Sequence, residues 1–131
     1  MTERIKWTDC EGFTILHIDY SDLPEEAYLD TIEEAAQLLR ALQGVPSDSP
    51  ILIMANVVNT RTTDSIADKF KEISTVMEQF NGYAHAVVGE PRALRPFARI
   101  LRPGMYLTGT EQDARNWLLR QARRYTKRHP A

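Results

Sequence analysis

Hydrophobic residues change their spacing several times along the chain, and each spacing predicts a different element. Residues 5–8 and 13–20 are short β-prone runs, and residues 9–12 between them end in glycine, as the connection of a β-hairpin does. Over residues 28–42 the apolar side chains recur at helical spacing, which predicts a first helix. Glycine and prolines between residues 44 and 50 are expected to end it.

The run Ile51–Val57 carries apolar residues on both alternating faces, which is typical of a strand that is covered on both sides. A helix is expected from about 63 to 80, because its apolar residues recur every three or four positions. Residues 83–88 repeat the central-strand pattern. A short helix is predicted over 94–101, and Pro96 favours a start near residue 94 or 95 because proline suits the first helical turn.

Residues 105–107 predict a last strand, and Thr110–Asp113 has the form of a near capping box that opens a last helix. The order is therefore β-β-α-β-α-β-α-β-α, and this alternation implies right-handed crossovers and a largely parallel sheet. We expect a single α/β domain over residues 1–131, with a core at about 5–119 and a mixed sheet of four or five strands covered by about four helices.

Composition gives few restrictions on function. Cys10 is the sole cysteine, so no internal disulfide forms and no oxidising compartment is needed. The first residues lack the apolar segment of a secretory signal, and no apolar run is long enough for a membrane span. The sequence therefore predicts a cytoplasmic protein with no membrane span.

The net charge of −2 conceals an uneven distribution of charges along the chain. Residues 1–50 hold eleven acidic and three basic side chains, residues 51–90 five and three, and residues 91–131 two and ten. The basic residues end in a tail at 120–131. Two interpretations stand: the basic third binds an acidic partner or ligand, or it matches the acidic third inside one molecule.

Four stretches resemble a known family when their spacing along the chain is considered. They are FTILHIDYSDL (13–23), ILIMANVVNT (51–60), AHAVVGEPRAL (84–94) and TEQDARNWLL (110–119). Together they resemble the small bacterial STAS-like proteins related to the anti-sigma factor antagonist of sporulation. The resemblance implies a mixed sheet of four or five strands with about four helices, and a regulatory role exerted by binding partner proteins.

In that family a serine inside an Asp-Ser-Ser-Gly motif, at the start of the helix after the central strand, is phosphorylated to switch binding. The corresponding residues here are Asp64, Ser65, Ile66 and Ala67. Asp64 and Ser65 match the first two positions, whereas Ile66 stands where the phosphorylated serine would be. Ile66 also begins the apolar stripe of its helix, so the resemblance leaves Ser65 as the phosphorylation candidate.

Polar loops are expected together at the carboxyl ends of the parallel strands, where α/β sheets have their usable crevice. The candidates for partner or ligand binding are Asn59, Thr60, Arg61, Thr62, Thr63, Ser65, Arg92 and Arg95. Hydroxyls, amides, guanidinium groups and a helix N-terminus suit an anion or a polar partner surface. The alternative is that Thr62 or Thr63 caps the helix and that Asn59 and Thr60 only turn the chain.

Arg92, Arg95, Arg99 and Arg102 would form one basic stripe if their segment were helical throughout. The stripe could bind phosphate or an acidic partner, or be an ordinary solvated face. Nucleic acid is not expected as a partner, because the whole chain is slightly acidic and no aromatic residues are interleaved with the basic ones.

The sequence contains few residue patterns that suit a metal site or acid–base catalysis. His17, His85 and His129 are isolated from one another and from Cys10, so no metal site is expected. His17 and His85 lie inside predicted strands and are interpreted as hydrogen-bonded, partly buried side chains. Asp19 ends a strand, where it caps a loop or serves as a lone carboxylate. No nucleophile elbow, Walker loop or Rossmann glycine pattern is present, so no cofactor is expected.

The leading hypothesis is a non-enzymatic regulatory or protein-interaction domain that binds a partner through the region from Asn59 to Ser65. The alternative is a carrier that holds a small lipid-like or anionic molecule between sheet and helices, with Arg92 or Arg95 as counter-ion. A third hypothesis is an enzyme that uses Asp19 or His17. Self-association as a homodimer, through a sheet edge or an apolar helix face, is a further expectation.

Overall fold

The computed structural model describes residues 3–42, 50–80 and 82–128. These residues form five strands and four helices in the predicted order. The elements are β1 (Ile5–Cys10), β2 (Phe13–Asp19), α1 (Glu25–Leu42), β3 (Ile51–Asn56), α2 (Asp64–Met77), β4 (Tyr83–Val88), α3 (Pro91–Ala98), β5 (Met105–Thr108) and α4 (Glu111–Arg128). No helix among the described residues is long and apolar enough to cross a membrane.

The opening hairpin is confirmed, with β1 and β2 paired antiparallel from Ile5 opposite Ile18 to Cys10 opposite Phe13. Its connection is tighter than the predicted four residues, because only Glu11 and Gly12 remain outside the ladder. Both have positive φ angles, 50° and 87°. Two such residues twist the chain in the sense that suits a right-twisted strand pair, so the hairpin closes with two residues.

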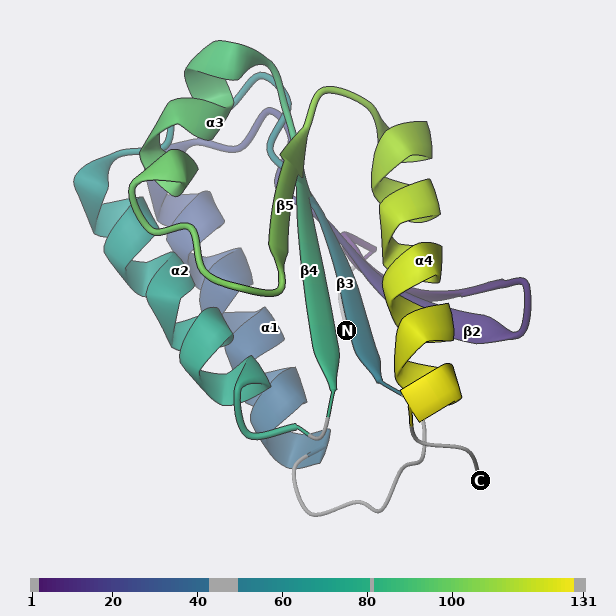
Figure 1. Ribbon diagram of the computed structural model, residues 1–131. Helices are drawn as coiled ribbons and strands as arrows, with labels where there is room; N and C mark the ends of the chain where they lie inside the picture. Colours follow the sequence, from purple (N-terminus) through teal and green to yellow (C-terminus); the bar gives the residue numbers. More distant parts are fainter. Residues whose placement is uncertain (1–2, 43–49, 81, 129–131) are drawn as a thin grey trace.

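Strands β2 to β5 are parallel, and the order across the sheet is β1-β2-β3-β4-β5. The mixed, mostly parallel sheet predicted from sequence is therefore present. Each crossover adds the next strand on the same side, so α1, α2 and α3 all lie on one face of the sheet (Figure 1). The last helix, α4, follows the edge strand β5 and returns over the opposite face.

Two cores result, one on each face. Strand β3 contributes to both, since Ile53 and Ala55 pack with the α1–α3 core while Leu52 and Met54 pack with the α4 core. The predicted apolar stripe of α2 is buried, with Ile66, Phe70 and Ile73 fully inaccessible. This burial on both sides explains why the Ile51–Val57 run has no polar face.

Helix α3 differs from its prediction. It begins at Pro91, three residues before the expected start, and ends at Ala98 with Pro96 inside it. Pro91 occupies a first-turn position that its fixed φ suits, so Glu90 and Pro91 start the helix before Pro96 is reached. The N–H that Pro96 lacks would bond the Arg92 carbonyl, and the helix ends only two residues later.

The ends of α4, α2 and α1 can be compared with their predictions. The predicted cap of α4 is present, because the Asp113 N–H donates to the Thr110 hydroxyl at 3.1 Å. The Asp113 carboxylate does not complete a capping box; it accepts hydrogen bonds from Tyr106 and Thr108 of β5, at 2.6 and 2.7 Å. Helix α2 ends at Met77, earlier than the predicted residue 80. Most of the glycine and proline region expected to end α1 lies outside the described residues.

Candidate functional site

An open cleft of about 610 Å³ lies where β3 and β4 end and where α2 and α3 begin. Its lining comes from two loops: Asn59, Thr60, Arg61 and Thr62 after β3, with Glu90 and Arg92 after β4. Five of the eight sequence-predicted binding residues thus line one cleft, at the carboxyl edge of the parallel strands. Thr63, Ser65 and Arg95 are not part of the lining.

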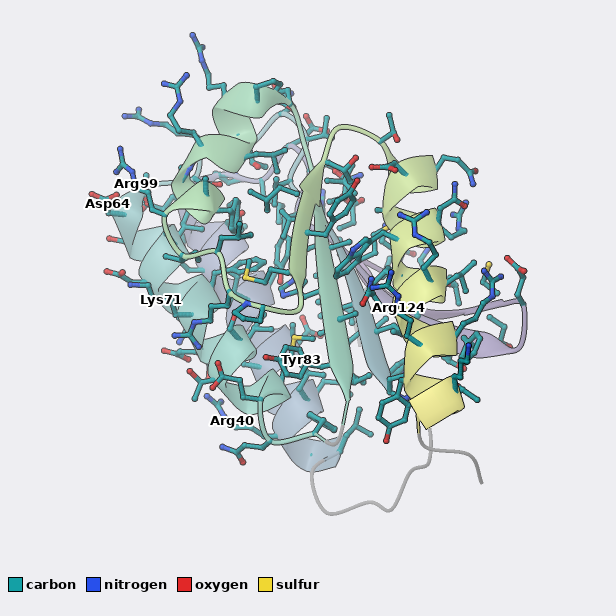
Figure 2. The ribbon with its side chains drawn as sticks, viewed as in Figure 1. Arg40, Asp64, Lys71, Tyr83, Arg99 and Arg124 are labelled. Atoms are coloured by element: carbon teal, nitrogen blue, oxygen red, sulfur yellow. The ribbon has the colours of Figure 1, made fainter. Side chains whose placement is uncertain are left out.

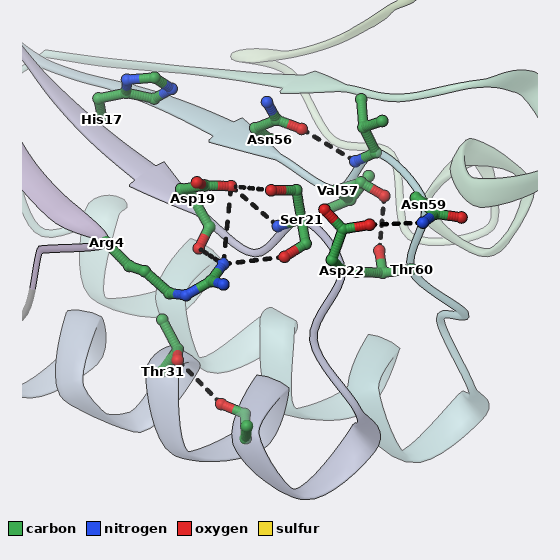
Figure 3. A network of polar contacts seen from close by, with 12 residues as sticks. Arg4, His17, Asp19, Ser21, Asp22, Thr31, Asn56, Val57, Asn59 and Thr60 are labelled. Atoms are coloured by element: carbon green, nitrogen blue, oxygen red, sulfur yellow. Dashed lines mark hydrogen bonds and ion pairs between the residues drawn. The ribbon is translucent and has the colours of Figure 1, made fainter.

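The loop after β3 is held by its own polar groups. The Val58 N–H donates to the Asn56 side chain at 2.9 Å, and the Thr60 hydroxyl donates to the Val57 carbonyl at 2.5 Å. Figure 3 shows both contacts at the end of the strand. Thr60 is 9% exposed, so the side chain at this turn is packed against the rest of the protein. The loop therefore presents Asn59 and Arg61 from a fixed backbone.

Asn59 joins the cleft loops to one another. Its N–H donates to the Glu90 carboxylate, at 3.0 Å to Oε1 and 3.3 Å to Oε2. Its side-chain amide donates to Asp22, in the loop after β2 (Figure 3). Asn59 has a φ of 56°, a left-handed conformation that asparagine tolerates better than most residues. Glu90 belongs to a loop expected at this edge of the sheet, but it was not among the predicted binding residues, because its hydrogen-bond partner is 31 residues away.

The capping interpretation of the same region is confirmed for Thr63. Thr63 is the N-cap of α2: its hydroxyl accepts the Ile66 N–H at 3.3 Å and donates to Glu25 of α1 at 3.0 Å. Thr62 is buried and contacts the Tyr28 hydroxyl, with 3.3 Å between the two oxygens. Thr62 and Thr63 thus fix the start of α2 against α1, and Thr62 also lines the cleft together with Asn59 to Arg61.

Tyrosines beneath this region are unsuited to acid–base chemistry. Tyr20 and Tyr28 are fully buried and stack with ring centroids 5.0 Å apart. Burial raises the pKa of Tyr28, and burial together with the neighbouring Tyr28 raises the pKa of Tyr20 well above the ordinary value. Both side chains therefore stay neutral phenols at neutral pH and support the cleft by packing.

Unpaired positive charge is present at the cleft. Arg61 and Arg92 are both exposed, and neither guanidinium has a hydrogen bond or ion pair with any residue that the structure describes. The predicted four-arginine stripe is not present as such, because the helix ends at Ala98. Arg99 lies 4.0 Å from Asp64 (Figure 2), and Arg102, beyond the helix, pairs with Glu78 at 2.6 Å.

The acidic and basic thirds of the chain do meet inside one molecule. Arg123 of α4 donates to Glu11 in the β1–β2 turn at 2.7 Å. Arg124, one residue on, is exposed on the same helix (Figure 2). The internal-match interpretation is therefore correct for Arg123, while Arg61 and Arg92 are left for other contacts.

Ser65 and Ile66, the two residues that the resemblance relates to a phosphorylation switch, differ in burial. Ser65 is exposed in the first turn of α2, and Ile66 is fully buried in the core between the sheet and the helices. Ile66 thus has the core role assigned from its position in the apolar stripe. A phosphate at Ser65 would sit beside the helix N-terminus, where negative charge is favoured.

Asp19 and His17, the candidates for enzyme chemistry, have separate partners. The Asp19 carboxylate accepts the Ser21 N–H at 2.9 Å and the Ser21 hydroxyl at 2.5 Å, with Arg4 at 3.8 Å. This is the expected loop-capping arrangement, and Figure 3 shows His17 apart from it. The His17 Nε2 atom lies 3.4 Å from the Glu111 carboxylate of α4. Neither residue lines the cleft.

Within the described part of the chain, no group of three or more His, Cys, Asp or Glu side chains could hold a metal ion. Comparisons with known protein families, with curated proteins and with solved structures found no match to this chain.

Proposed function

We propose that this protein is a regulatory or protein-interaction domain of STAS-like type, without catalytic activity of its own, that binds a partner protein through the cleft. One observation carries the proposal: the cleft gathers predicted binding residues from two loops and includes two guanidinium groups, of Arg61 and Arg92, that no described residue pairs. Exposed arginines are among the residues enriched at protein interfaces.

The cleft is poorly equipped for acid–base or nucleophilic catalysis. Such chemistry needs two or more titratable groups that converge on one bound substrate. Among the described lining residues the only carboxylate is that of Glu90, and it is engaged by the Asn59 N–H. The guanidinium groups stay protonated at all relevant pH values and cannot act as general bases. These properties favour binding over catalysis.

The alternative hypothesis of a ligand carrier can be considered for two hollows of the described structure. The cavity between α2, β4 and β5 leaves only about 10 Å³ for the centre of a water-sized sphere, far too little for a lipid. The cleft, by contrast, has the volume of a small-molecule site, and Arg92 lines it while Arg95 does not. The alternative function remains a carrier of a small lipid-like or anionic ligand, and of these two the cleft suits the anion, because Arg92 lines it.

A paired capture experiment tests the proposal. Tagged wild-type protein is compared with the double variant Arg61→Ala/Arg92→Ala, and each recovered protein is identified and its binding measured again with purified components. The matched control is Arg124→Ala/Lys127→Ala, which removes the same charge from exposed positions on α4 across the sheet. We expect the cleft variant to bind at least about tenfold more weakly, a change of roughly 1.4 kcal/mol, and the control to bind as wild type.

Two other outcomes would decide against the proposal. If both double variants weaken binding equally, the contact is a diffuse charge effect and not the cleft. If no purified partner binds but native mass spectrometry finds a small anion that Arg92→Ala loses, the carrier alternative is correct.

A further inference from the structure

His85, on β4, is a buried imidazole whose polar atoms are not satisfied by the protein. It is 1% exposed, and its ring stacks on Phe70 of α2 with centroids 5.0 Å apart. Neither Nδ1 nor Nε2 has a hydrogen-bond partner among the described residues. The sequence predicted a hydrogen-bonded, partly buried histidine. That prediction is wrong for His85, which is fully buried and has no hydrogen bond to a described residue.

A small cavity adjoins this imidazole, between α2, β4 and the segment that leads into β5. Its lining includes the buried side chains of Ser74, Met77 and His85, the half-buried Met105, and the exposed ion pair of Glu78 with Arg102. The cavity leaves about 10 Å³ for the centre of a water-sized sphere. That volume is roughly the minimum that holds one water molecule.

We propose that this cavity is a binding site for one internal water molecule, held by an imidazole nitrogen of His85 and the hydroxyl of Ser74. This inference is independent of the cleft and of the function proposed for it.

The chemistry of the two side chains supports this occupant. Neutral imidazole offers one donor and one acceptor, and a serine hydroxyl offers one donor and two acceptor sites. No hydrogen bond of the Ser74 hydroxyl occurs within the described ranges, although Ser74 is only 6% exposed. A bridging water gives the buried His85 nitrogen a hydrogen-bond partner and joins it to the Ser74 hydroxyl, whereas a buried nitrogen left unpaired destabilises the fold. The site would thereby join α2 to β4 through a polar contact inside an apolar core.

A soft monovalent cation is the rival occupant, because the lining also contains the thioethers of Met77 and Met105 beside the imidazole. The charges favour water. The carboxylate in the lining, that of Glu78, lies 2.6 Å from the Arg102 guanidinium and is already neutralised. A cation would therefore enter a largely apolar cavity without a free counter-charge.

The test combines crystallography with NMR on the chain of residues 1–131. In the wild type we expect a water peak about 2.7–3.2 Å from a His85 ring nitrogen, and a nuclear Overhauser effect between that water and the His85 ring protons. Ser74→Val fills the space and removes the hydroxyl, so the effect should be lost; Thr75→Val, an exposed change on the same helix, should retain it. If Ser74→Val does not fold, the wild-type peak alone decides.

Two results would overturn the inference. One is a well-ordered wild-type cavity that holds no water, with His85 bonded to a protein atom. The other is a titration with Ag⁺ that shifts the Met77 and Met105 methyl resonances at stoichiometric concentration, a response that would show a soft-cation site instead. We expect no such shift.

Discussion

The backbone N–H of Asn59 donates to the Glu90 carboxylate at 3.0 Å, and this hydrogen bond joins the two loops that form the cleft. The same residue reaches a third loop through its side-chain bond to Asp22. Asn59 occupies a left-handed conformation, with φ at 56°, and its N–H points to the Glu90 carboxylate at the start of α3. The cleft is thus held in shape by contacts between loops that are distant in sequence.

Removing the Glu90 carboxylate should loosen the cleft more than it destabilises the fold. We expect Glu90→Ala to lower the free energy of unfolding by about 1 kcal/mol, since it removes a hydrogen bond at an exposed position. Amide exchange at residues 59–62 should accelerate. Urea unfolding and hydrogen exchange measure the two effects. Glu90→Gln, which retains an acceptor oxygen, should recover most of the protection, and Glu3→Ala, at an exposed position outside the cleft, should change neither quantity.

Ile66 and Ser65 should respond in opposite ways to polar substitution. Ile66→Ser removes apolar volume from a fully buried position and adds a hydroxyl there, so we expect a loss of about 3–4 kcal/mol in unfolding free energy. Ser65→Asp, at an exposed first-turn position, should stay within about 0.5 kcal/mol of the wild type. Urea denaturation distinguishes them. A wild-type stability for Ile66→Ser would mean that this position is accessible to modification after all.

The sequence predicted the central strand and the second helix well, because the spacing of their apolar residues follows directly from which faces are buried. Strand β3 is apolar on both faces since a helical layer covers each, and the stripe beginning at Ile66 is the core face of α2. The start of α3 was predicted wrongly because the rule for Pro96 was applied without the stronger first-turn preference of Pro91.

The sequence predicted which loops lie together at the candidate site, but it did not predict the contacts between their residues. Parallel strands bring their carboxyl ends to one edge, so the loops after β3 and β4 could be placed together from element order alone. The pairing of Asn59 with Glu90 and of Arg102 with Glu78 joins residues 31 and 24 positions apart, and no local pattern records it. His85 was misjudged for the same reason, since its stacking partner Phe70 belongs to another element.

Three glycines provide a graded test of backbone conformation. Gly104 has a φ of +91°, and a Cβ there would lie 2.6 Å from the Tyr83 ring. Gly12 has a φ of +87° and open space around a Cβ, whereas Gly109 has open space and a φ outside the left-handed region. We therefore expect Gly104→Ala to cost about 2 kcal/mol or more, Gly12→Ala about 1 kcal/mol, and Gly109→Ala roughly nothing. Thermal and urea unfolding measure the order, and equal losses at Gly104 and Gly12 would show that the Tyr83 ring moves aside freely.

His85 should make the protein less stable in mild acid. Burial lowers the pKa of His85 to about 4, whereas a histidine in the unfolded chain titrates near 6.5. Between these values the unfolded chain binds a proton that the folded chain excludes, so protonation favours unfolding. The free energy that neutral His85 contributes to stability is therefore fully present above roughly pH 6.5 and is lost as the pH falls toward about 4. The free energy of unfolding falls by at most about 1.4 kcal/mol per pH unit in this window.

The variant His85→Phe isolates this effect, because an aromatic ring of similar shape can stack on Phe70 without titrating. Urea unfolding at pH 7, 6 and 5 should show the wild type losing stability relative to His85→Phe by about 1 kcal/mol per pH unit across the lower part of this range. His17→Gln serves as the control, since His17 is partly exposed and lies beside Glu111 on the other face of the sheet. Parallel curves for the wild type and His85→Phe would mean that His85 accepts a proton in the folded state, and that its surroundings are more polar than its burial indicates.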